Sequence, residues 1–261
     1  MMKLLNIELK KLLPYRAFKI MLLIFVISLA GTVIVGKQLN KVSDMIPGEQ
    51  VNTLGFPNVW NFYLYTCLFF NIILALLVIF VVSNEYTYRT IRQNIIDGMT
   101  RNDIVTGKIL LIFLLSVLST LTVYITGIIA GMMYSSSWEF ADIFERNSLL
   151  FGYFLQTLCI LAMAYLFATI FKRSGIATIA FILFIFPIDV LINQAIFKGD
   201  INDYMPVSNM FRKIIEAPYN ALLRSDAAVQ TEPGILSICV TVFYILFFFG
   251  AGWYITKKRD L

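Results

Sequence analysis

Residues 62–83 read FYLYTCLFFNIILALLVIFVVS, a run without a single charged side chain. A helix of about 20 apolar residues is long enough to cross roughly 30 Å of hydrocarbon. The whole chain has the same character, since 59% of its 261 residues are apolar, 14% are charged, and the mean hydropathy is +0.79. One aqueous core cannot bury so much apolar surface, because a soluble domain needs a polar exterior. The sequence therefore predicts an integral membrane protein.

Five further segments resemble this run in length and hydropathy: 18–36, 109–134, 148–171, 176–197 and 234–256. All should be helices, because an isolated spanning segment must satisfy its own backbone hydrogen bonds. The predicted fold is all-α, with six transmembrane helices in a single membrane domain over residues 1–261. In this plan, residues 84–108 connect the second span to the third on the cytoplasmic side, and residues 198–233 are expected to form an extracellular loop.

The basic residues predict the orientation of these spans. Six spans place both termini on one side, which carries fourteen basic and only five acidic residues. The basic ones are Lys3, Lys10, Lys11, Arg16, Lys19, Arg89, Arg92, Arg101, Lys108, Lys172, Arg173, Lys257, Lys258 and Arg259. Cytoplasmic loops are enriched in Lys and Arg, so we expect both termini in the cytoplasm and the protein in a bacterial inner membrane. Topology thus explains the net charge of +5 without nucleic acid.

The first span has a second interpretation. Ser28-Leu29-Ala30 before Gly31 resembles the cleavage site of a secretory signal that follows a basic arm and an apolar run. The length of the arm argues against cleavage, which would also remove the cytoplasmic N-terminus. A mature chain that begins at Gly31 would refute the six-span prediction.

Catalytic and metal-binding side chains are scarce. The chain has no histidine, which excludes Ser-His and Cys-His nucleophile pairs and His-ligated metals. Cys67, Cys159 and Cys239 each lie in an apolar run without C-x-x-C spacing, so we expect buried small apolar side chains. The sequence therefore predicts neither an enzyme nor a metal site.

The N-terminal arm, residues 1–17, has an amphipathic pattern. Lys3, Asn6 and Lys10 share one half of a helical wheel, opposite a leucine-rich half, and Pro14 breaks the helix. This pattern predicts a short helix in the inner interface, with its lysines toward anionic headgroups. The alternative is a simple continuation of the first span.

The connection at 84–108 predicts a short cytoplasmic helix. Its apolar residues recur at near-helical spacing, and Glu85 and Arg89 are four residues apart, which supports a helix. Gly98 can supply the left-handed residue that ends it, and Thr100 with Asp103 fits a capping box that opens the next helix. Such an element suits docking into a groove of another protein; the alternative is a solvated or headgroup-bound loop.

These residues resemble a known family. Glu85, Thr90-Ile91-Arg92, Gly98-Met99-Thr100-Arg101 and Lys108 are similar to the E…T-x-R…G-x-x-R…K run that follows the second membrane helix of ABC-2-type transporter permeases. The Glu8-Leu9-Lys10-Lys11 arm and the six-span plan are also similar, so the resemblance covers the whole chain. One departure is Arg89, where many relatives have glycine.

The resemblance implies the ABC-2, type V exporter-like permease fold, in which the segment after span two is a coupling helix that contacts a cytoplasmic ATPase. The residues that it implies for this contact are Glu85, Arg89, Thr90, Arg92, Gly98, Arg101, Asp103 and Lys108. It also implies a permease dimer, formed with a second copy or with a paralogous permease.

The sequence contains no nucleotide-binding loop of the form G-x-x-x-x-G-K-[ST], since Gly107-Lys108 is followed by Ile109. The short cytoplasmic segments are also too small to build a nucleotide-binding domain. We therefore expect this chain to bind no cofactor and a partner ATPase dimer to bind ATP and Mg²⁺.

Two further sites are predicted inside the spans. Asp189, with Asn193 after it, is a candidate polar group of a transport pathway or its outer gate; alternatively Pro187 breaks the helix and Asp189 already meets outer water. Gly127 and Gly131 form a G-x-x-x-G that allows close helix packing, within the chain or at a dimer seam.

The expected function is the membrane-spanning permease subunit of an ATP-driven exporter. A stand-alone secondary transporter, which needs polar ion-binding groups at mid-depth, and a membrane scaffold that transports nothing remain alternatives.

Overall fold

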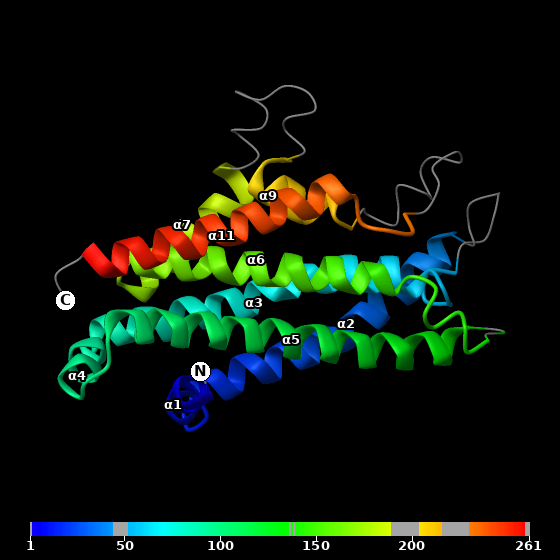
Figure 1. The fold of residues 1–261 in the computed structure, drawn as a ribbon. Helices are drawn as coiled ribbons and strands as arrows, with labels where there is room; N and C mark the ends of the chain where they lie inside the picture. The colour runs from blue at the N-terminus through cyan, green and yellow to red at the C-terminus, as the bar shows by residue number, and fades with distance from the viewer. Residues whose placement is uncertain are drawn as a thin grey trace.

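The computed structural model describes residues 2–43, 52–135, 137, 139–188, 204–215 and 230–258, and over these ranges the fold is all-α. Five long apolar helices run side by side (Figure 1): α2 (Arg16–Ser43), α3 (Val59–Thr87), α5 (Arg101–Tyr134), α6 (Asn147–Phe171) and α11 (Ile235–Lys258). Each is long and apolar enough to cross a bilayer. The protein is therefore a multi-pass membrane protein, and five of the six predicted spans correspond to these helices.

The predicted fifth span, 176–197, is shorter in the structure. A regular helix, α7 (Ser174–Leu183), passes into a wider π-helical turn, η1 (Phe184–Ile188), and the rest of the predicted range lies outside the described residues. Pro187 lies in this turn, and a proline removes a backbone donor and clashes with the preceding turn. The regular α-helical hydrogen bonding therefore stops just before it.

The predicted extracellular loop, 198–233, contains helical structure packed into the bundle. It includes α9 (Pro206–Ser208) and the π-helix η3 (Asn209–Lys213). Met210 is fully buried, and its carbonyl oxygen accepts a hydrogen bond of 2.6 Å from the Gln156 side chain of α6. The extracellular location of this range stays a prediction, and its described part is helical, with apolar side chains that fill space between the long helices.

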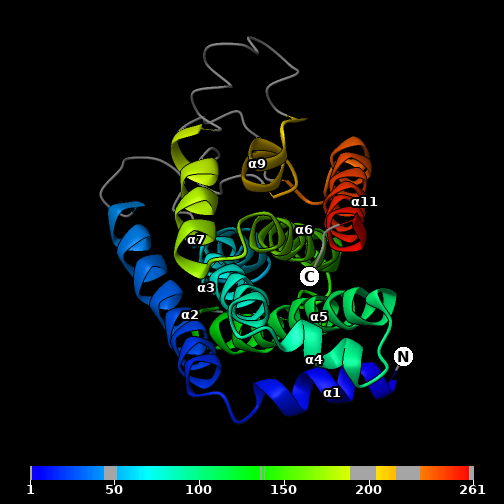
Figure 2. The same cartoon turned by 90° about the vertical axis from the view of Figure 1, so that its left-hand side faces the viewer.

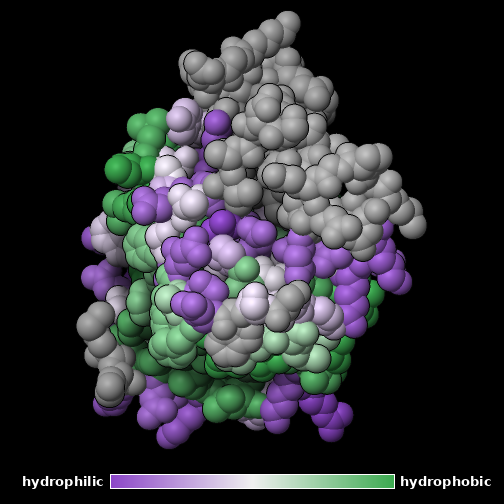
Figure 3. All heavy atoms as spheres, turned by 90° about the vertical axis from the view of Figure 1, so that its right-hand side faces the viewer, coloured by the Kyte–Doolittle hydropathy of each residue, from purple (hydrophilic) through white to green (hydrophobic). Residues whose placement is uncertain are grey.

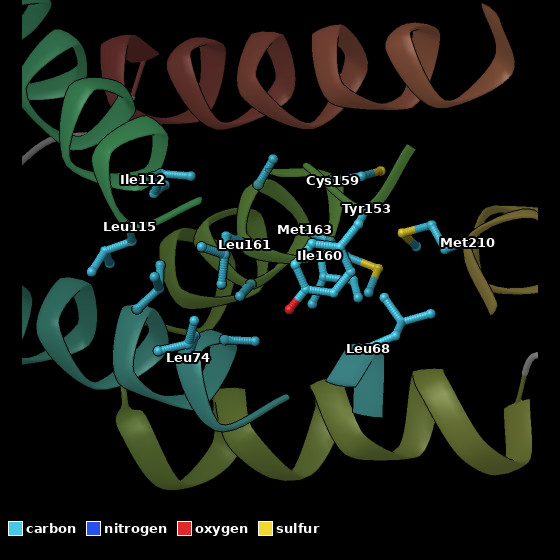
Figure 4. Close-up of a cluster of buried hydrophobic side chains, with 14 of the residues drawn as sticks. Leu68, Leu74, Ile112, Leu115, Tyr153, Cys159, Ile160, Leu161, Met163 and Met210 are labelled. Carbon is cyan, nitrogen blue, oxygen red and sulfur yellow. The ribbon is translucent and has the colours of Figure 1, made fainter. Parts of the chain in front are cut away.

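The bundle is organised around α3 and α6, with α2, α5, α7 and α11 around them (Figure 2). A cluster of buried side chains from α3, α5, α6 and η3 forms the core (Figure 4), including Leu68, Leu74, Ile112, Leu115, Tyr153, Cys159, Ile160, Leu161, Met163 and Met210. Cys67 is also buried. The prediction of a buried thiol is wrong for Cys239, which is exposed on the peripheral helix α11.

The N-terminal arm forms a separate helix, α1 (Met2–Leu12), which lies across the direction of the long helices (Figure 2). The chain turns at Pro14 before α2 begins, so the alternative of a continuous first span is wrong. Lys3 and Lys10 are exposed, as an interfacial helix requires, but Glu8 and Leu12 are buried. One face of α1 thus packs on the protein, mainly on α5, rather than on lipid.

We call the end of the bundle that carries α1, the short helix α4 (Thr90–Ile96) and the C-terminal end of α11 the α4 end (Figure 1). Two contacts hold α5 and α11 together there: the Arg101 guanidinium donates to the carbonyl oxygen of Lys257, and the Trp253 indole N–H donates to the Asn102 side chain at 3.0 Å. Helix α1 and the C-terminal end of α11 thus lie at the same end of the bundle, and the cytoplasmic location of that end stays a prediction.

Polar residues also gather over part of the opposite end, with hydrophobic residues around them (Figure 3). At this end the buried Arg146 guanidinium donates to Asn61 at 2.6 Å and to Asn58 at 3.2 Å. Along the long helices, large apolar side chains such as Ile27, Leu121 and Phe243 are exposed. Two polar ends and an apolar belt are what a bilayer requires of a protein that spans it.

Candidate functional site

The connection at the α4 end contains the predicted short helix, and the two long helices on either side extend into it. Helix α3 continues to Thr87, α5 already begins at Arg101, and only the seven residues of α4 lie between them as a separate helix. Arg89 has a left-handed backbone (φ 55°) that ends the path of α3 and starts α4 in a new direction. The predicted helix-supporting pair of Glu85 and Arg89 is therefore wrong, because the two residues do not share one helix.

The predicted end of the short helix and start of the next are confirmed. Gly98 has φ 92°, a conformation that glycine adopts without a steric penalty, and it turns the chain after α4. The Thr100 hydroxyl accepts from the Asp103 backbone N–H at 3.2 Å, and the Asp103 carboxylate accepts from the Thr100 N–H at 3.0 Å. This reciprocal capping box fixes where α5 begins and so limits how far α4 can swing.

A buried cluster of four charges lies behind this connection. Lys108 on α5 contacts Glu8 of α1 and lies 2.7 Å from the Glu85 carboxylate of α3. Lys11 lies 3.5 Å from each of the same two carboxylates and is partly exposed. We call Glu8, Lys11, Glu85 and Lys108 the charge cluster. Its two acids and two bases balance, as buried charges must if their desolvation is to be offset.

The charge cluster ties three elements together at the α4 end. Glu8 is 3%, Glu85 8% and Lys108 3% exposed, so they offer almost no surface to a partner. The resemblance implies Glu85 and Lys108 as ATPase contacts, which stays a prediction; in the structure the ion pairs of Lys108 with Glu8 and with Glu85 hold α1 and α3 on α5. Sequence reasoning missed Glu8 as their partner, although the Glu8–Lys11 spacing of three residues on a helix was a signal for a local pair.

The surface of the connection is formed by other residues. Ile96 is 77% and Tyr88 71% exposed, and the Arg92 side chain is exposed between them in sequence. Ile91 is buried and packs α4 onto the bundle. Arg89, Thr90 and Gly98 are exposed, whereas Arg101 and Asp103 are half-buried. The exposed surface of α4 and of the turn before it thus combines cationic and apolar groups.

A neutral polar network lies in the interior and was not predicted. Asn71 of α3 donates to the Thr157 hydroxyl at 2.8 Å and accepts from Ser119 at 3.0 Å and Tyr153 at 3.1 Å. All four residues are buried. The signal was Asn71, the one amide within the apolar run 62–83. Because these groups satisfy one another, the network joins α3, α5 and α6 and presents no unpaired charge.

The G-x-x-x-G glycines of α5 lie against aromatic rings of the same chain. A Cβ atom on Gly127 would lie 2.9 Å from the Trp60 ring, and one on Gly131 would overlap the Phe56 ring. Their close packing is therefore used within the chain, where small residues let α5 approach these rings.

The remaining predicted positions cannot be placed. Asp189 and Asn193 lie outside the described residues. Within the described ranges no three His, Cys, Asp or Glu residues are grouped so that they could hold a metal ion.

A family model described as "Protein of unknown function (DUF2705)" matches residues 21–261. No curated protein matches the chain.

Proposed function

The chain belongs to the DUF2705 family of proteins of unknown function, and we propose that this member is the membrane-spanning subunit of an ATP-driven transporter of the ABC-2 exporter kind. In this proposal a separate cytoplasmic ATPase dimer hydrolyses ATP and contacts α4. Two copies of this chain, or this chain and a paralogous permease, form the path for the substrate.

The observation that carries the proposal is the attachment of α4. The helix projects at one end of the bundle with Ile96 and Arg92 exposed, and short turns connect it directly to the interior helix α3 and to α5. The charge cluster joins these two helices a few residues away. A displacement of α4 is therefore transmitted to two spans together, as a coupling element requires.

Within the described residues, the interior favours this proposal over a stand-alone secondary transporter. Ion-coupled transporters place polar or charged ion ligands near the middle of the membrane. The Asn71 network between α3, α5 and α6 is neutral, and its four side chains already bond to one another. A scaffold that transports nothing would require no rigid link between its contact helix and the interior.

The proposal is tested by site-specific photo-crosslinking in cells. A photoreactive amino acid at position 96, which is exposed at the α4 end, should capture a protein that carries the G-x-x-x-x-G-K-[ST] loop. The matched control is position 140, where Phe140 is 72% exposed beyond the other end of α5. Capture of no such protein at position 96, or equal capture at both positions, would overturn the proposal.

A second experiment measures function with the captured ATPase. The purified full chain in lipid nanodiscs should raise the rate of ATP hydrolysis by that ATPase, and Ile96→Asp should abolish the increase, since it places a charge in the apolar part of the contact. Phe140→Asp should leave the stimulation unchanged. Equal stimulation by the wild-type chain and by Ile96→Asp would show that α4 is not the coupling contact.

A further inference from the structure

A basic cleft of about 580 Å³ opens at the α4 end, between the turn that joins α3 to α4 and the turn that joins α6 to α7. Four cationic side chains line it. Arg89 lies in the turn before α4 and Arg92 in α4 itself, while Lys172 and Arg173 lie in the turn between α6 and α7. The first residues of α7, Ser174 and Gly175, complete its wall. We call this the basic cleft.

The backbone brings these cations together in an unusual way. In the described part of the chain, Arg89 (φ 55°) and Lys172 (φ 57°) are the non-glycine residues with a left-handed backbone. Such a conformation is sterically strained for a residue with a side chain, and glycine would avoid that strain. Both sharp turns therefore carry a basic residue at the strained position, and both lie on the same cleft.

The cations of the basic cleft have no counter-ion in the described structure. Its one acidic lining residue, Glu85, is already paired with Lys108 at 2.7 Å and with Lys11 at 3.5 Å. The ion pairs of the described residues involve none of Arg89, Arg92, Lys172 or Arg173. Lys172 instead has its ammonium 5.8 Å from the centre of the Tyr86 ring. The cleft is thus a concentration of positive charge that suits an anion.

The surface directly beside the basic cleft is apolar. Ile176, Ile179 and Leu183 of α7 are 49%, 61% and 46% exposed, and their spacing places them in one stripe along the helix. This stripe begins one residue after Gly175, where the chain passes from the polar end of the bundle into its apolar belt. Cationic groups at the boundary with an apolar stripe beneath them match an anionic headgroup with its acyl chains.

We propose that the basic cleft binds the phosphate group of an anionic phospholipid, whose acyl chains lie along the stripe of Ile176, Ile179 and Leu183. The inference is independent of the proposed transport function, because it requires neither an ATPase nor a particular orientation in the membrane. Arg89 and Arg92 approach the phosphate from one side, and Lys172 and Arg173 from the other.

Native mass spectrometry of the purified full chain tests this proposal. Dioctanoyl phosphatidylglycerol should form a one-to-one adduct, and dioctanoyl phosphatidylcholine should bind at least about tenfold more weakly, because its choline cation offsets the phosphate charge. A free phosphate ion carries the same kind of charge as a lipid phosphate group, so inorganic phosphate is added as a competitor of the lipid. Displacement of the lipid by phosphate at the same concentration would show that the cleft takes a free anion, and this would overturn the lipid proposal.

The variant Lys172→Gln with Arg173→Gln should weaken phosphatidylglycerol binding about tenfold or more, since it removes two charged contacts. The matched control is Lys257→Gln with Lys258→Gln, which removes the same charge at the same end but outside the cleft, where both lysines lie over aromatic rings. Equal weakening in both pairs would show non-specific attraction and overturn the proposal.

A measurement on the wild-type chain covers the case in which the cleft variant does not fold. Hydrogen exchange of residues 172–176 should slow in nanodiscs of phosphatidylglycerol relative to nanodiscs of phosphatidylcholine, while residues 253–257 should exchange equally in both. The same exchange of residues 172–176 in both lipids would contradict the proposal.

Discussion

Replacing Lys108 by methionine tests whether the charge cluster stabilises the bundle. The Lys108 ammonium contacts both buried carboxylates, Glu8 and Glu85, more closely than Lys11 does, and it is almost completely removed from solvent. Without it two buried carboxylates share only Lys11, whose contacts are 3.5 Å long and whose side chain is 32% exposed. Removing one partner of a buried ion pair costs about 3–5 kcal/mol, because the remaining charge stays desolvated.

The neighbouring lysine supplies the matched comparison. Lys11→Met removes the same charge and makes the same kind of substitution, but its partly exposed ammonium is screened by water. We expect it to lower the free energy of unfolding by about 1 kcal/mol or less. The double variant Lys108→Met with Glu8→Gln should recover part of the loss, with a coupling energy of about 0.5–3 kcal/mol.

The assay is unfolding of the purified chain in mixed micelles with increasing sodium dodecyl sulfate, followed by far-ultraviolet circular dichroism. Wild type, both single variants and the double variant are compared at one pH and one ionic strength. The reasoning is refuted if Lys108→Met is no less stable than Lys11→Met, or if adding Glu8→Gln lowers the stability of Lys108→Met further by the full cost of a second lost contact.

The same unfolding assay tests three other sites, with Gly250 as the control for the first of them. Gly131→Ala should destabilise the chain by about 1–3 kcal/mol because the added methyl group overlaps the Phe56 ring, whereas Gly250→Ala, which meets no atom within 4 Å, should be neutral or stabilising by up to about 1 kcal/mol. Asn71→Leu should cost about 1–3 kcal/mol, since it leaves three buried hydroxyl groups without their shared partner; no measurable loss would show that water replaces the amide. Thr100→Ala should cost about 1 kcal/mol and speed hydrogen exchange in the first turn of α5, and unchanged exchange there would contradict the role of the capping box.

The positions of most helices follow from the sequence, because a bilayer imposes a simple length and hydropathy requirement on each span. The runs around 18–36, 62–83, 109–134, 148–171 and 234–256 each correspond to a long helix. Their ends were harder to predict, since α3 and α5 extend several residues past their apolar runs. Helical hydrogen bonding continues into the polar boundary wherever no proline, glycine or cap stops it.

Several helix ends were also predictable, because they depend on residue types within a few positions of the end. Pro14, Gly98 and the pair of Thr100 and Asp103 end or begin helices in the structure as their residue types require. Arg89 is the exception, because arginine itself does not indicate a left-handed turn; the only hint was that the family that the chain resembles often has glycine there.

The pairing of distant charges and polar groups was decided by tertiary structure alone. Composition shows that Glu8, Glu85 and Lys108 are charged, and spacing places them near one side of the membrane. It contains no information on which side chains meet, such as Lys11 with Glu85 across 74 residues or Glu8 with Lys108 across 100. The basic cleft is likewise invisible in the sequence, since it forms only where the turn after α3 approaches the turn after α6. Hydropathy is a property of each segment by itself, whereas a buried ion pair or a cleft depends on how the segments pack.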